Sequence, residues 1–275
     1  MRKAGAQALA WLLRYEVLWV TVLAWLAFCS IPITLGHIGL SWDALNHHIY
    51  LGWAAEHGRF NRDFWAASSQ SYQVPYTYWP VYKLAVSGFD GVTAGMVLAA
   101  LGALTVPPVW LMAKVCIPGA GAFELFMRCA AVALAFMSVV MLSLFGSTQN
   151  DLLAAVPLVW AFALALQGTA HGPAHVPVPR WRSVVLAGLL AGVAVTFKLS
   201  NGPLALLMPL LWFFQRTGFW PRVRDVALGG VATLTGCVVT FAPWGWQVWH
   251  KFGNPIYPLY DGAFAPLRAL LGWQP

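Results

Sequence analysis

Charged residues are scarce in this sequence. Asp, Glu, Lys and Arg make up only 9% of its 275 residues, whereas hydrophobic residues make up 60%. The mean hydropathy is +0.67. Soluble globular domains carry about 25% charged residues, because their surfaces face water. The shortage of charge excludes an ordinary soluble domain and predicts a polytopic membrane protein.

Cysteine is also scarce, and the familiar catalytic motifs are absent. The four cysteines lie in or beside apolar runs, without C-x-x-C or other ligand spacing, which is typical of small core residues: Cys29, Cys116, Cys129 and Cys237. The sequence contains no P-loop, no H-E-x-x-H, no G-x-S-x-G and no G-x-G-x-x-G between a strand and a helix. These absences argue against a nucleotide-driven pump, a zinc protease, a typical serine hydrolase and a dehydrogenase.

The net charge of +7 is unevenly distributed along the chain. An excess of Lys and Arg on one side of the membrane sets the orientation of a membrane protein. The segments expected outside hold six bases and six acids, whereas those expected inside hold ten bases and three acids. The sequence therefore predicts a cytoplasmic N-terminus and no nucleic-acid partner. The inner residues are Arg2, Lys3, Arg14, Lys114, Arg128, Arg180, Arg182, Arg216, Arg222 and Arg224, with Glu16, Glu124 and Asp225.

Long apolar runs predict an all-α bundle with about seven transmembrane helices in a single domain, residues 1–275. Two spans are short, about 15 and 12 residues against the usual ~20, and would form a hairpin in which Gly188 and Gly192 allow close helix packing. The chain would lie outside in a first outer loop, 37–91, and in a C-terminal segment, 244–275. The expected spans are 17–36, 92–113, 129–147, 152–168, 183–197, 203–214 and 226–244.

The first outer loop opens with a stretch that reads as one amphipathic helix, residues 42–57. Ser41 is a good N-cap and Gly58 a good stop. One face would carry Trp42, Leu45, Ile49 and Trp53, and another Asp43, Asn46, His47 and Tyr50. Such a helix would lie in the membrane interface with its polar face toward a cavity. An ordinary connector whose polar face simply meets water is the alternative.

An aromatic segment follows at residues 61–83, where aromatic residues alternate with small polar residues and prolines. This composition makes a regular element unexpected. The segment fits an aromatic belt that anchors the loop to lipid. It also fits a platform for sugar rings, and both interpretations stay open.

Polar residues that could carry chemistry gather on the expected outer side. Ionisable groups near the membrane are costly and tend to mark function. Asp43 and Asp151 come from separate outer loops that could converge over one cavity, and Lys198 would be recessed at the tip of the short hairpin. Asp43 and His47 could supply two metal ligands, which are too few to indicate a metal site. The set is Asp43, Asn46, His47, His48, Asn150, Asp151, Lys198 and Asn201.

Four motifs, taken in order, resemble the GT-C superfamily of multi-span membrane glycosyltransferases. The acidic residue on a helix after the first span corresponds to Trp42-Asp43 through Gly58. The second acidic position corresponds to QNDLLAAVPLVWAFALAL with Asp151. The stretch GLLAGVAVTFKLSNGPLALLMPL, 188–210, resembles the family's glycine-rich hairpin, and FGNPIYPLY, 252–260, resembles a loop of its bacterial members. Members usually have several further spans, so the resemblance predicts a fragment or a short member.

The resemblance implies an inverting sugar transfer on the outer face, from a polyprenyl-phosphate donor to a glycan, lipid or protein acceptor, in a bacterial inner membrane. Asp43 would be the general base and Asp151 would orient the acceptor or the sugar. Lys198, with His47 or His48, would stabilise the lipid phosphate. No cofactor is implied, and membrane lipids are the expected surroundings. The substrate-binding set would be Asn46, His47, His48, Tyr50, Asn150, Lys198 and Asn201.

Two other classes of function remain open from the residues alone. A transporter or flippase of lipid-linked sugars would line its path with Asp43, Asp151 and Lys198. It would spread polar groups through the membrane, whereas here they gather at one surface. A non-catalytic scaffold subunit is the other alternative, which the early end of the chain keeps open.

Overall fold

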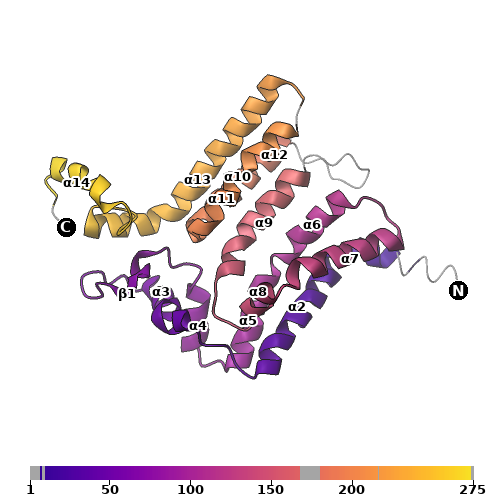
Figure 1. Cartoon of the computed structure of the whole chain (residues 1–275), viewed down its shortest axis with the longest axis horizontal. Coiled ribbons are helices and arrows are strands. Elements are labelled where there is room, and N and C mark those ends of the chain that lie inside the picture. The colour runs from indigo at the N-terminus through magenta and orange to yellow at the C-terminus, as the bar shows by residue number, and fades with distance from the viewer. Residues whose placement is uncertain (1–6, 8–9, 168–179, 216, 274–275) are drawn as a thin grey trace.

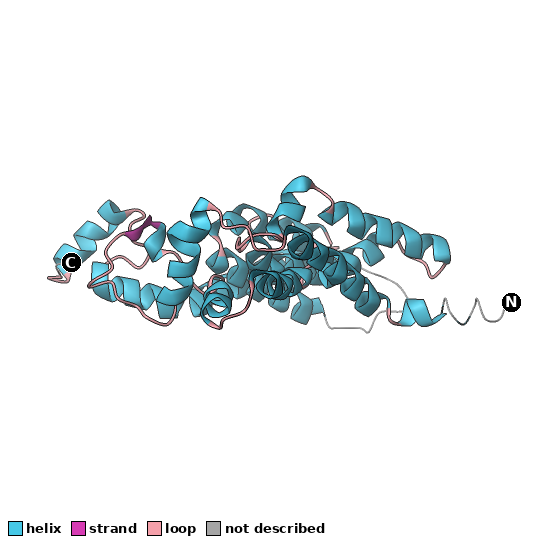
Figure 2. Ribbon diagram, turned by 90° about the horizontal axis from the view of Figure 1, so that it is seen from below, coloured by secondary structure: helices cyan, strands magenta, loops and turns pink. Residues whose placement is uncertain are grey.

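The computed structural model describes residues 7, 10–167, 180–215 and 217–273, and most of these residues are helical. Apart from the four-residue strand β1 (Ala66–Ser69), the regular elements are helices, which confirms the all-α class (Figures 1 and 2). The predicted inner positions Arg2, Lys3 and Arg216, and the inner loop 169–179, lie outside the described residues.

Four helices are long and apolar enough to cross a membrane, which fits an integral membrane protein. They correspond to the predicted spans 17–36, 92–113, 183–197 and 226–244. The helices are α2 (Glu16–Leu35), the continuous pair α5 (Gly91–Ala103) and α6 (Val106–Cys116), α10 (Arg180–Phe197) and α13 (Phe219–Phe252).

Three of these four helices are longer than the sequence pattern predicts: the continuous pair α5 and α6, α10 and α13. The helix α10 has 18 residues, since its first turn includes the two arginines that were assigned to a loop. The helix α13 has 34 residues and absorbs the start of the predicted C-terminal segment, 244–275. Its ends are set by Gly218 and Gly253, whose positive φ angles of 86° and 62° favour glycine. Polar residues mark the end of an apolar run, but the helical backbone continues through them.

The other three predicted spans are shorter or broken helices in the part of the chain that the structure describes. Span 129–147 is divided into α7 (Ala122–Phe136) and α8 (Val139–Leu144), because the hydroxyl of Ser138 accepts the N–H of Met141 and begins a new helix. Span 152–168 is α9 (Asp151–Gln167), with 17 residues. Span 203–214 is divided into α11 (Gly202–Ala205) and α12 (Met208–Phe214).

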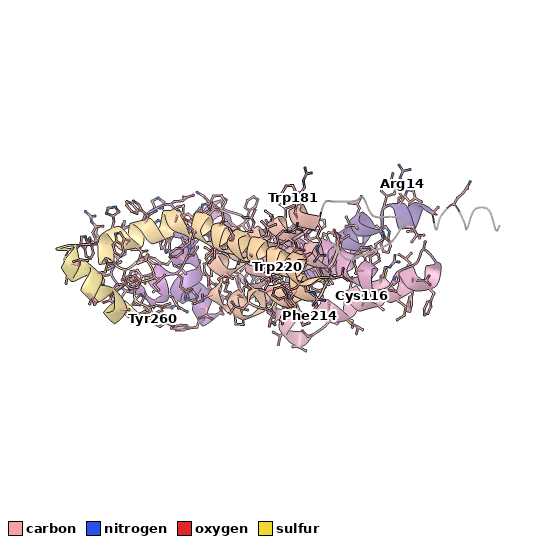
Figure 3. All side chains as sticks on the ribbon, turned by 90° about the horizontal axis from the view of Figure 1, so that it is seen from above. Arg14, Cys116, Trp181, Phe214, Trp220 and Tyr260 are labelled. Carbon is pink, nitrogen blue, oxygen red and sulfur yellow. The ribbon has the colours of Figure 1, made fainter. Side chains whose placement is uncertain are left out.

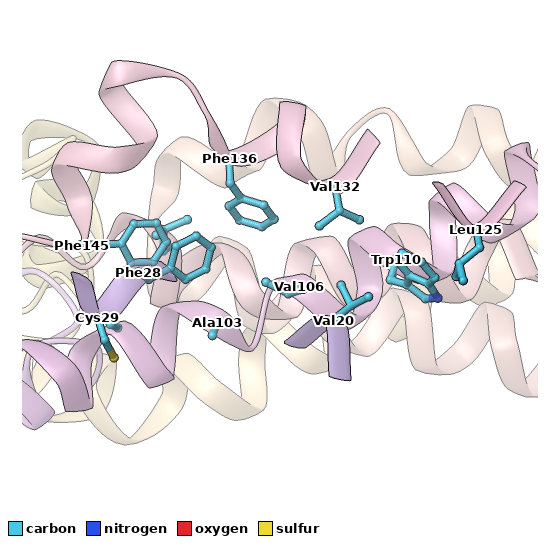
Figure 4. Close-up of a cluster of buried hydrophobic side chains, with 12 residues drawn as sticks. Val20, Phe28, Cys29, Ala103, Val106, Trp110, Leu125, Val132, Phe136 and Phe145 are labelled. Atoms are coloured by element: carbon cyan, nitrogen blue, oxygen red, sulfur yellow. The ribbon is translucent and has the colours of Figure 1, made fainter. Parts of the chain in front are cut away.

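Two hydrophobic cores divide the helices into two groups that meet along α9. The first core contains residues of α2 and of the helices from α5 through α8. In it Phe28 stacks on Phe145, with ring centroids 3.8 Å apart (Figure 4). The second core contains residues of the helices from α9 through α13. Within it α10 and α13 approach so closely that a Cβ atom added to Gly192 would lie 2.0 Å from the carbonyl oxygen of Thr233. Gly188 and Gly192 allow close helix packing as predicted, but their close neighbours are on α13 and not in the other half of the predicted hairpin.

Buried ion pairs hold together one end of each group. Glu16 at the start of α2 is buried and pairs with Lys114 and with Arg128, whose Nη1 lies 3.2 Å from a Glu16 oxygen. Asp225 on α13 is fully buried and accepts from Nε of Arg180 at 2.7 Å. Both clusters lie at the starts of α2, α10 and α13, so they share one end of the molecule, called here the basic end. Figure 3 shows Arg14 and Cys116 toward one end of the long axis and Tyr260 toward the other.

The opposite end, called here the loop end, carries residues 37–90 and the α9 start. The predicted helix 42–57 begins as expected, and the Ser41 hydroxyl accepts the N–H of Ala44 at 3.2 Å. It contains a π-helical turn, η1 (Ala44–His48), continues as α3 (Ile49–Ala54) and ends earlier than predicted. A π turn holds one more residue than an α turn, so it turns the following residues to a new face.

The aromatic segment 61–83 is more regular than expected. It holds β1, the 3-10 turn η2 (Gln70–Tyr72) and the start of α4 (Trp79–Val86). Its side chains pack with the end of α13 in a cluster that we call the aromatic cluster, and Trp244 donates from Nε1 to the carbonyl of Tyr72 at 2.9 Å. Beyond α13 the chain forms α14 (Asp261–Leu270). The aromatic cluster consists of Ala54, Tyr72, Trp244, Val248 and Phe252.

Candidate functional site

The loop end brings together four segments that are far apart in the sequence. They are η1, the turn before α4, the turn before α9 and the end of α10. His48 lies 2.8 Å from Thr148 between Nδ1 and Oγ1, and Asn150 donates from Nδ2 to the hydroxyl of Thr77 at 2.7 Å. All four of these side chains are buried. Buried polar contacts of this kind fix the relative positions of the segments.

Lys198 and Asp151 form an ion pair across the ends of α10 and α9. The Lys198 Nζ atom lies 2.5 Å from Asp151 Oδ1 and 3.4 Å from Asn150 Oδ1. The side chains of Lys198 and Asp151 are 31% and 45% exposed, so a ligand can reach both. The structure therefore joins three of the predicted site residues in one polar group.

Asn201 has a supporting position beside this pair. Its amide group donates to the carbonyl of Ala194 at 2.9 Å and to the carbonyl of Ala154 at 3.0 Å. Both donor hydrogens are used to join α9 to the end of α10. The contacts of Asn201 thus hold the helices that carry Asp151 and Lys198.

Asp43 lies on the other side of the same polar region. Its carboxylate is half-exposed, at 48%, and its Oδ1 atom is 3.8 Å from Nδ1 of the buried His47. The rings of His47 and His48 meet edge to face with centroids 4.5 Å apart, and both pack on the buried ring of Tyr78. The π turn brings the two histidines to the same inward side.

Burial keeps both histidines uncharged at neutral pH. Desolvation lowers the pKa of His48 to about 4, with His47 and Lys198 acting in the same direction and the charges of Asp43 and Asp151 opposing it. Desolvation also lowers the pKa of His47, which Asp43 raises and Lys198 lowers. Asp43, Asp151 and Lys198 are thus close enough to act on one ring. An uncharged histidine can still donate a hydrogen bond to a phosphate, but it cannot pair with it as a cation.

Two of the predicted substrate-binding residues lie away from Asp43. Asn46 donates from Nδ2 to the side-chain carbonyl of Gln70 at 3.2 Å, which joins η1 to η2. Tyr50 packs against the aromatic cluster with its ring 5.9 Å from that of Trp53. The expectation that Tyr50 shares a face with Asp43 and His47 fails, because the π turn inserts one residue between them.

An apolar cavity of about 290 Å³ opens beside Asp151. It lies between the two helix groups, and its polar lining residues are Thr105, Asp151 and Asn201. Asp43 does not line this cavity. The expected convergence of Asp43 and Asp151 over one cavity therefore stays a prediction. The apolar walls are formed by Val109, Ala135, Phe136, Met141, Leu144, Leu152, Ala155 and Val159.

Sequence reasoning missed Tyr78 as a member of the site. This ring is 5% exposed, and burial, with the charge of Asp151, raises its pKa to about 12. A signal was present: Pro80 stands in the first turn of α4, and proline is favoured there. The motif P-Y-T-Y-W-P could thus have indicated a helix start with Thr77 and Tyr78 facing inward.

Within the described residues, no group of three or more His, Cys, Asp or Glu side chains is arranged to hold a metal ion. Comparisons with protein-family models, curated proteins and solved structures find no match for this chain. The interpretation of the site therefore depends on its geometry and on the motifs of the sequence.

Proposed function

We propose that this chain is an integral membrane glycosyltransferase that uses a polyprenyl-phosphate sugar as donor. The observation that carries the proposal is an accessible carboxylate, Asp43, close to the accessible ion pair of Lys198 and Asp151. A base for the acceptor and a cation for the leaving phosphate are the two groups that such a transfer needs. The order of the sequence motifs supports the same assignment.

The proposed topology has seven crossings, with the loop end on the outer face of a bacterial inner membrane. The four long helices make four crossings, and α7 with α8, α9, and α11 with α12 make the other three. The basic end is then cytoplasmic, as expected from the position of its Lys and Arg residues. This arrangement supports an active site on the outer face, with the N-terminus inside.

In the proposed reaction Asp43 takes the proton from an acceptor hydroxyl. The acceptor oxygen forms a bond to the anomeric carbon, while the bond from that carbon to the phosphate oxygen breaks and its electron pair goes to the phosphate. The products are the glycosylated acceptor, with inverted configuration, and the polyprenyl phosphate. Asp43 then releases its proton to water. The glycosyl group carries positive charge in the transition state.

Lys198 and Asp151 divide the rest of the work between them. The Lys198 ammonium moves from Asp151 toward the phosphate as negative charge develops on it, and Asp151 is then free to hold a hydroxyl of the sugar or of the acceptor. The apolar cavity beside Asp151 suits part of the lipid chain, since its walls are hydrocarbon. Glycan, lipid and protein acceptors are all compatible with this arrangement.

The first prediction tests Asp43 as the base. Asp43→Asn keeps the size of the side chain but removes the proton acceptor, so transfer should fall by roughly two to four orders of magnitude. The assay uses the full-length chain in lipid nanodiscs with a pool of polyprenyl-phosphate sugars and acceptors. Asp63→Asn is the matched control, because Asp63 is on the same loop and pairs with Arg59 instead.

Asp63→Asn should leave the rate within a few-fold of the parent protein. Unchanged transfer by Asp43→Asn would remove the base assignment. The transporter and scaffold alternatives would then be preferred. Movement of a lipid-linked sugar between the two leaflets of reconstituted vesicles would indicate the transporter, and its absence the scaffold.

A further inference from the structure

A buried nitrogen beside Asp43 has no hydrogen-bond partner. The Nδ1 atom of His47 is inaccessible to solvent and makes no hydrogen bond in the described structure. Its side chain is only 5% exposed. Nearly all buried polar atoms in proteins are hydrogen-bonded, and an exception requires an explanation. The polar atom that this nitrogen faces is Oδ1 of Asp43, 3.8 Å away.

We propose that His47 is the positioning residue for Asp43. Its Nδ1–H donates to Oδ1 of Asp43 in the reacting state, which directs Oδ2 toward the acceptor hydroxyl. The proposal rests on the proposed function, since it assigns the orientation of the same base. It gives His47 a different role from that of a phosphate ligand.

The geometry shows which of the two side chains moves. His47 is enclosed by the rings of His48 and Tyr78, whereas the Asp43 carboxylate is half-exposed and free to rotate. A hydrogen bond from nitrogen to oxygen needs about 2.9 Å, so Asp43 must approach by about 1 Å. A bound acceptor that reaches Asp43 from the solvent side would complete this rotation.

The surroundings of His47 keep it in the form that the role needs. Burial lowers its pKa, and the charged groups that act on it are Asp43 from its own helix and Lys198 from the end of α10. The rings packed on it are His48 and Tyr78. A neutral imidazole has one N–H, and it orients a carboxylate without cancelling the negative charge that accepts the proton. A lysine in the same place would form an ion pair instead.

The second prediction is a kinetic difference between two substitutions of His47. His47→Leu removes the donor and should lower kcat roughly 100-fold, with the KM for the lipid donor unchanged, since Asp43 is then misplaced. His47→Asn places an amide N–H near the position of Nδ1 and should recover most of that loss. The control is His57→Leu, because the exposed His57 stacks on Trp53 and should not affect kcat.

A raised KM with unchanged kcat in His47→Leu would overturn the proposal and make His47 a donor ligand. Equal losses in His47→Leu and His47→Asn would overturn it as well. If Asp43→Asn stays active, the proposed function itself fails, so the two failures are distinguishable.

A spectroscopic measurement on the unsubstituted chain, made with the acceptor pool and without the lipid donor, tests the same point without a rate assay. With 15N-labelled histidine, the neutral His47 ring should carry its proton on Nδ1, and Asp43→Leu should shift the ring toward the Nε2–H tautomer. The resonance is assigned by its loss in His47→Asn. A ring protonated only on Nε2, or one unaffected by Asp43→Leu, would overturn the proposal.

Discussion

His48 joins segments of the loop end through a hydrogen bond and a ring contact, and its burial makes these contacts sensitive to acid. Its ring is 4% exposed, its Nδ1 lies 2.8 Å from the hydroxyl of Thr148, and it stacks on Tyr78. Charging the ring requires removing a cation from water, which lowers its pKa to about 4. Folding of the loop end therefore prefers the neutral form.

The third prediction concerns stability in acid. Below pH 6.5 the unfolded chain binds a proton at His48, but the folded chain does not until about pH 4. The free energy of unfolding therefore falls as pH falls through this window, by on the order of 3 kcal/mol in total, and is steady above it. Thermal unfolding in detergent between pH 7.5 and pH 4 measures the effect.

The variant His48→Asn isolates the contribution of this one residue. It keeps a polar contact to Thr148 without a titrating group, so its Tm should fall less than that of the parent between pH 6.5 and pH 4. His57→Asn should follow the parent curve. A constant difference between parent and His48→Asn at every pH would contradict the prediction.

The polar residues of the site could be predicted from sequence, but their pairing could not. Asn150, Asp151 and Lys198 stood out because polar residues are rare beside apolar spans. That Lys198 pairs with Asp151 depends on how α9 packs on α10, which no local pattern encodes. The place of Tyr50 was wrong for a different reason: helical spacing assumes 3.6 residues per turn, and the π turn breaks that spacing.

At the scale of helices, α10 and α13 form a contact with little free space. A Cβ atom added at Gly192 would come within 2.0 Å of the carbonyl of Thr233, and one at Gly236 within 2.2 Å of the carbonyl of Leu189. These neighbours are backbone atoms, which cannot rotate away. The contact holds the end of α10, and hence Lys198, in place.

The fourth prediction is that this contact does not accept a side chain. Gly192→Leu should destabilise the protein by about 1–3 kcal/mol or prevent folding, because the two helices must separate. Gly230→Leu is the control, since a Cβ atom at Gly230 on α13 meets no atom within 4 Å. The measurement is thermal unfolding of both variants in the same detergent. Equal stability of Gly192→Leu and Gly230→Leu would show that the contact is looser than described.

Helix positions were predictable where an apolar run and a stop signal coincide. The helix α2 differs from its predicted span by one residue at each end, because its apolar run ends at Gly36 in the left-handed conformation. The ends of α13 were wrong, since arginines and tryptophans were taken as boundaries. Such residues mark the ends of the apolar run, whereas the backbone hydrogen bonds of α13 continue until Gly253.

For the whole molecule, the basic end and the loop end differ in how they are held. Buried ion pairs of Glu16 with Arg128 and of Asp225 with Arg180 hold the basic end. Breaking such a pair from one side is strongly destabilising, since it leaves a buried charge. The loop end is held by buried aromatic rings and neutral hydrogen bonds, and its ion pairs, such as Lys198 with Asp151, are partly exposed. This difference fits the proposal that substrates enter at the loop end.

The fifth prediction concerns orientation. Cys116 is exposed at the end of α6, so in the proposed topology a membrane-impermeant maleimide should label it only from the cytoplasmic side. The test uses a variant whose other cysteines are replaced by alanine. Ser87→Cys, at the exposed end of α4 in the loop end, should be labelled in intact cells. Labelling of Cys116 in intact cells would reverse the orientation.

The length of α13 has a consequence for the membrane that surrounds it. Its 34 residues extend about 51 Å at 1.5 Å per residue, against a hydrocarbon layer of about 30 Å. The surplus carries Trp244 and Phe252 into the aromatic cluster, so in the proposed topology the helix would set the height of loop 37–90 above the acyl chains. In the proposed reaction, a thicker bilayer would lift the phosphate of the lipid donor toward Lys198, and a thinner one would lower it. The proposed transfer would therefore depend on bilayer thickness.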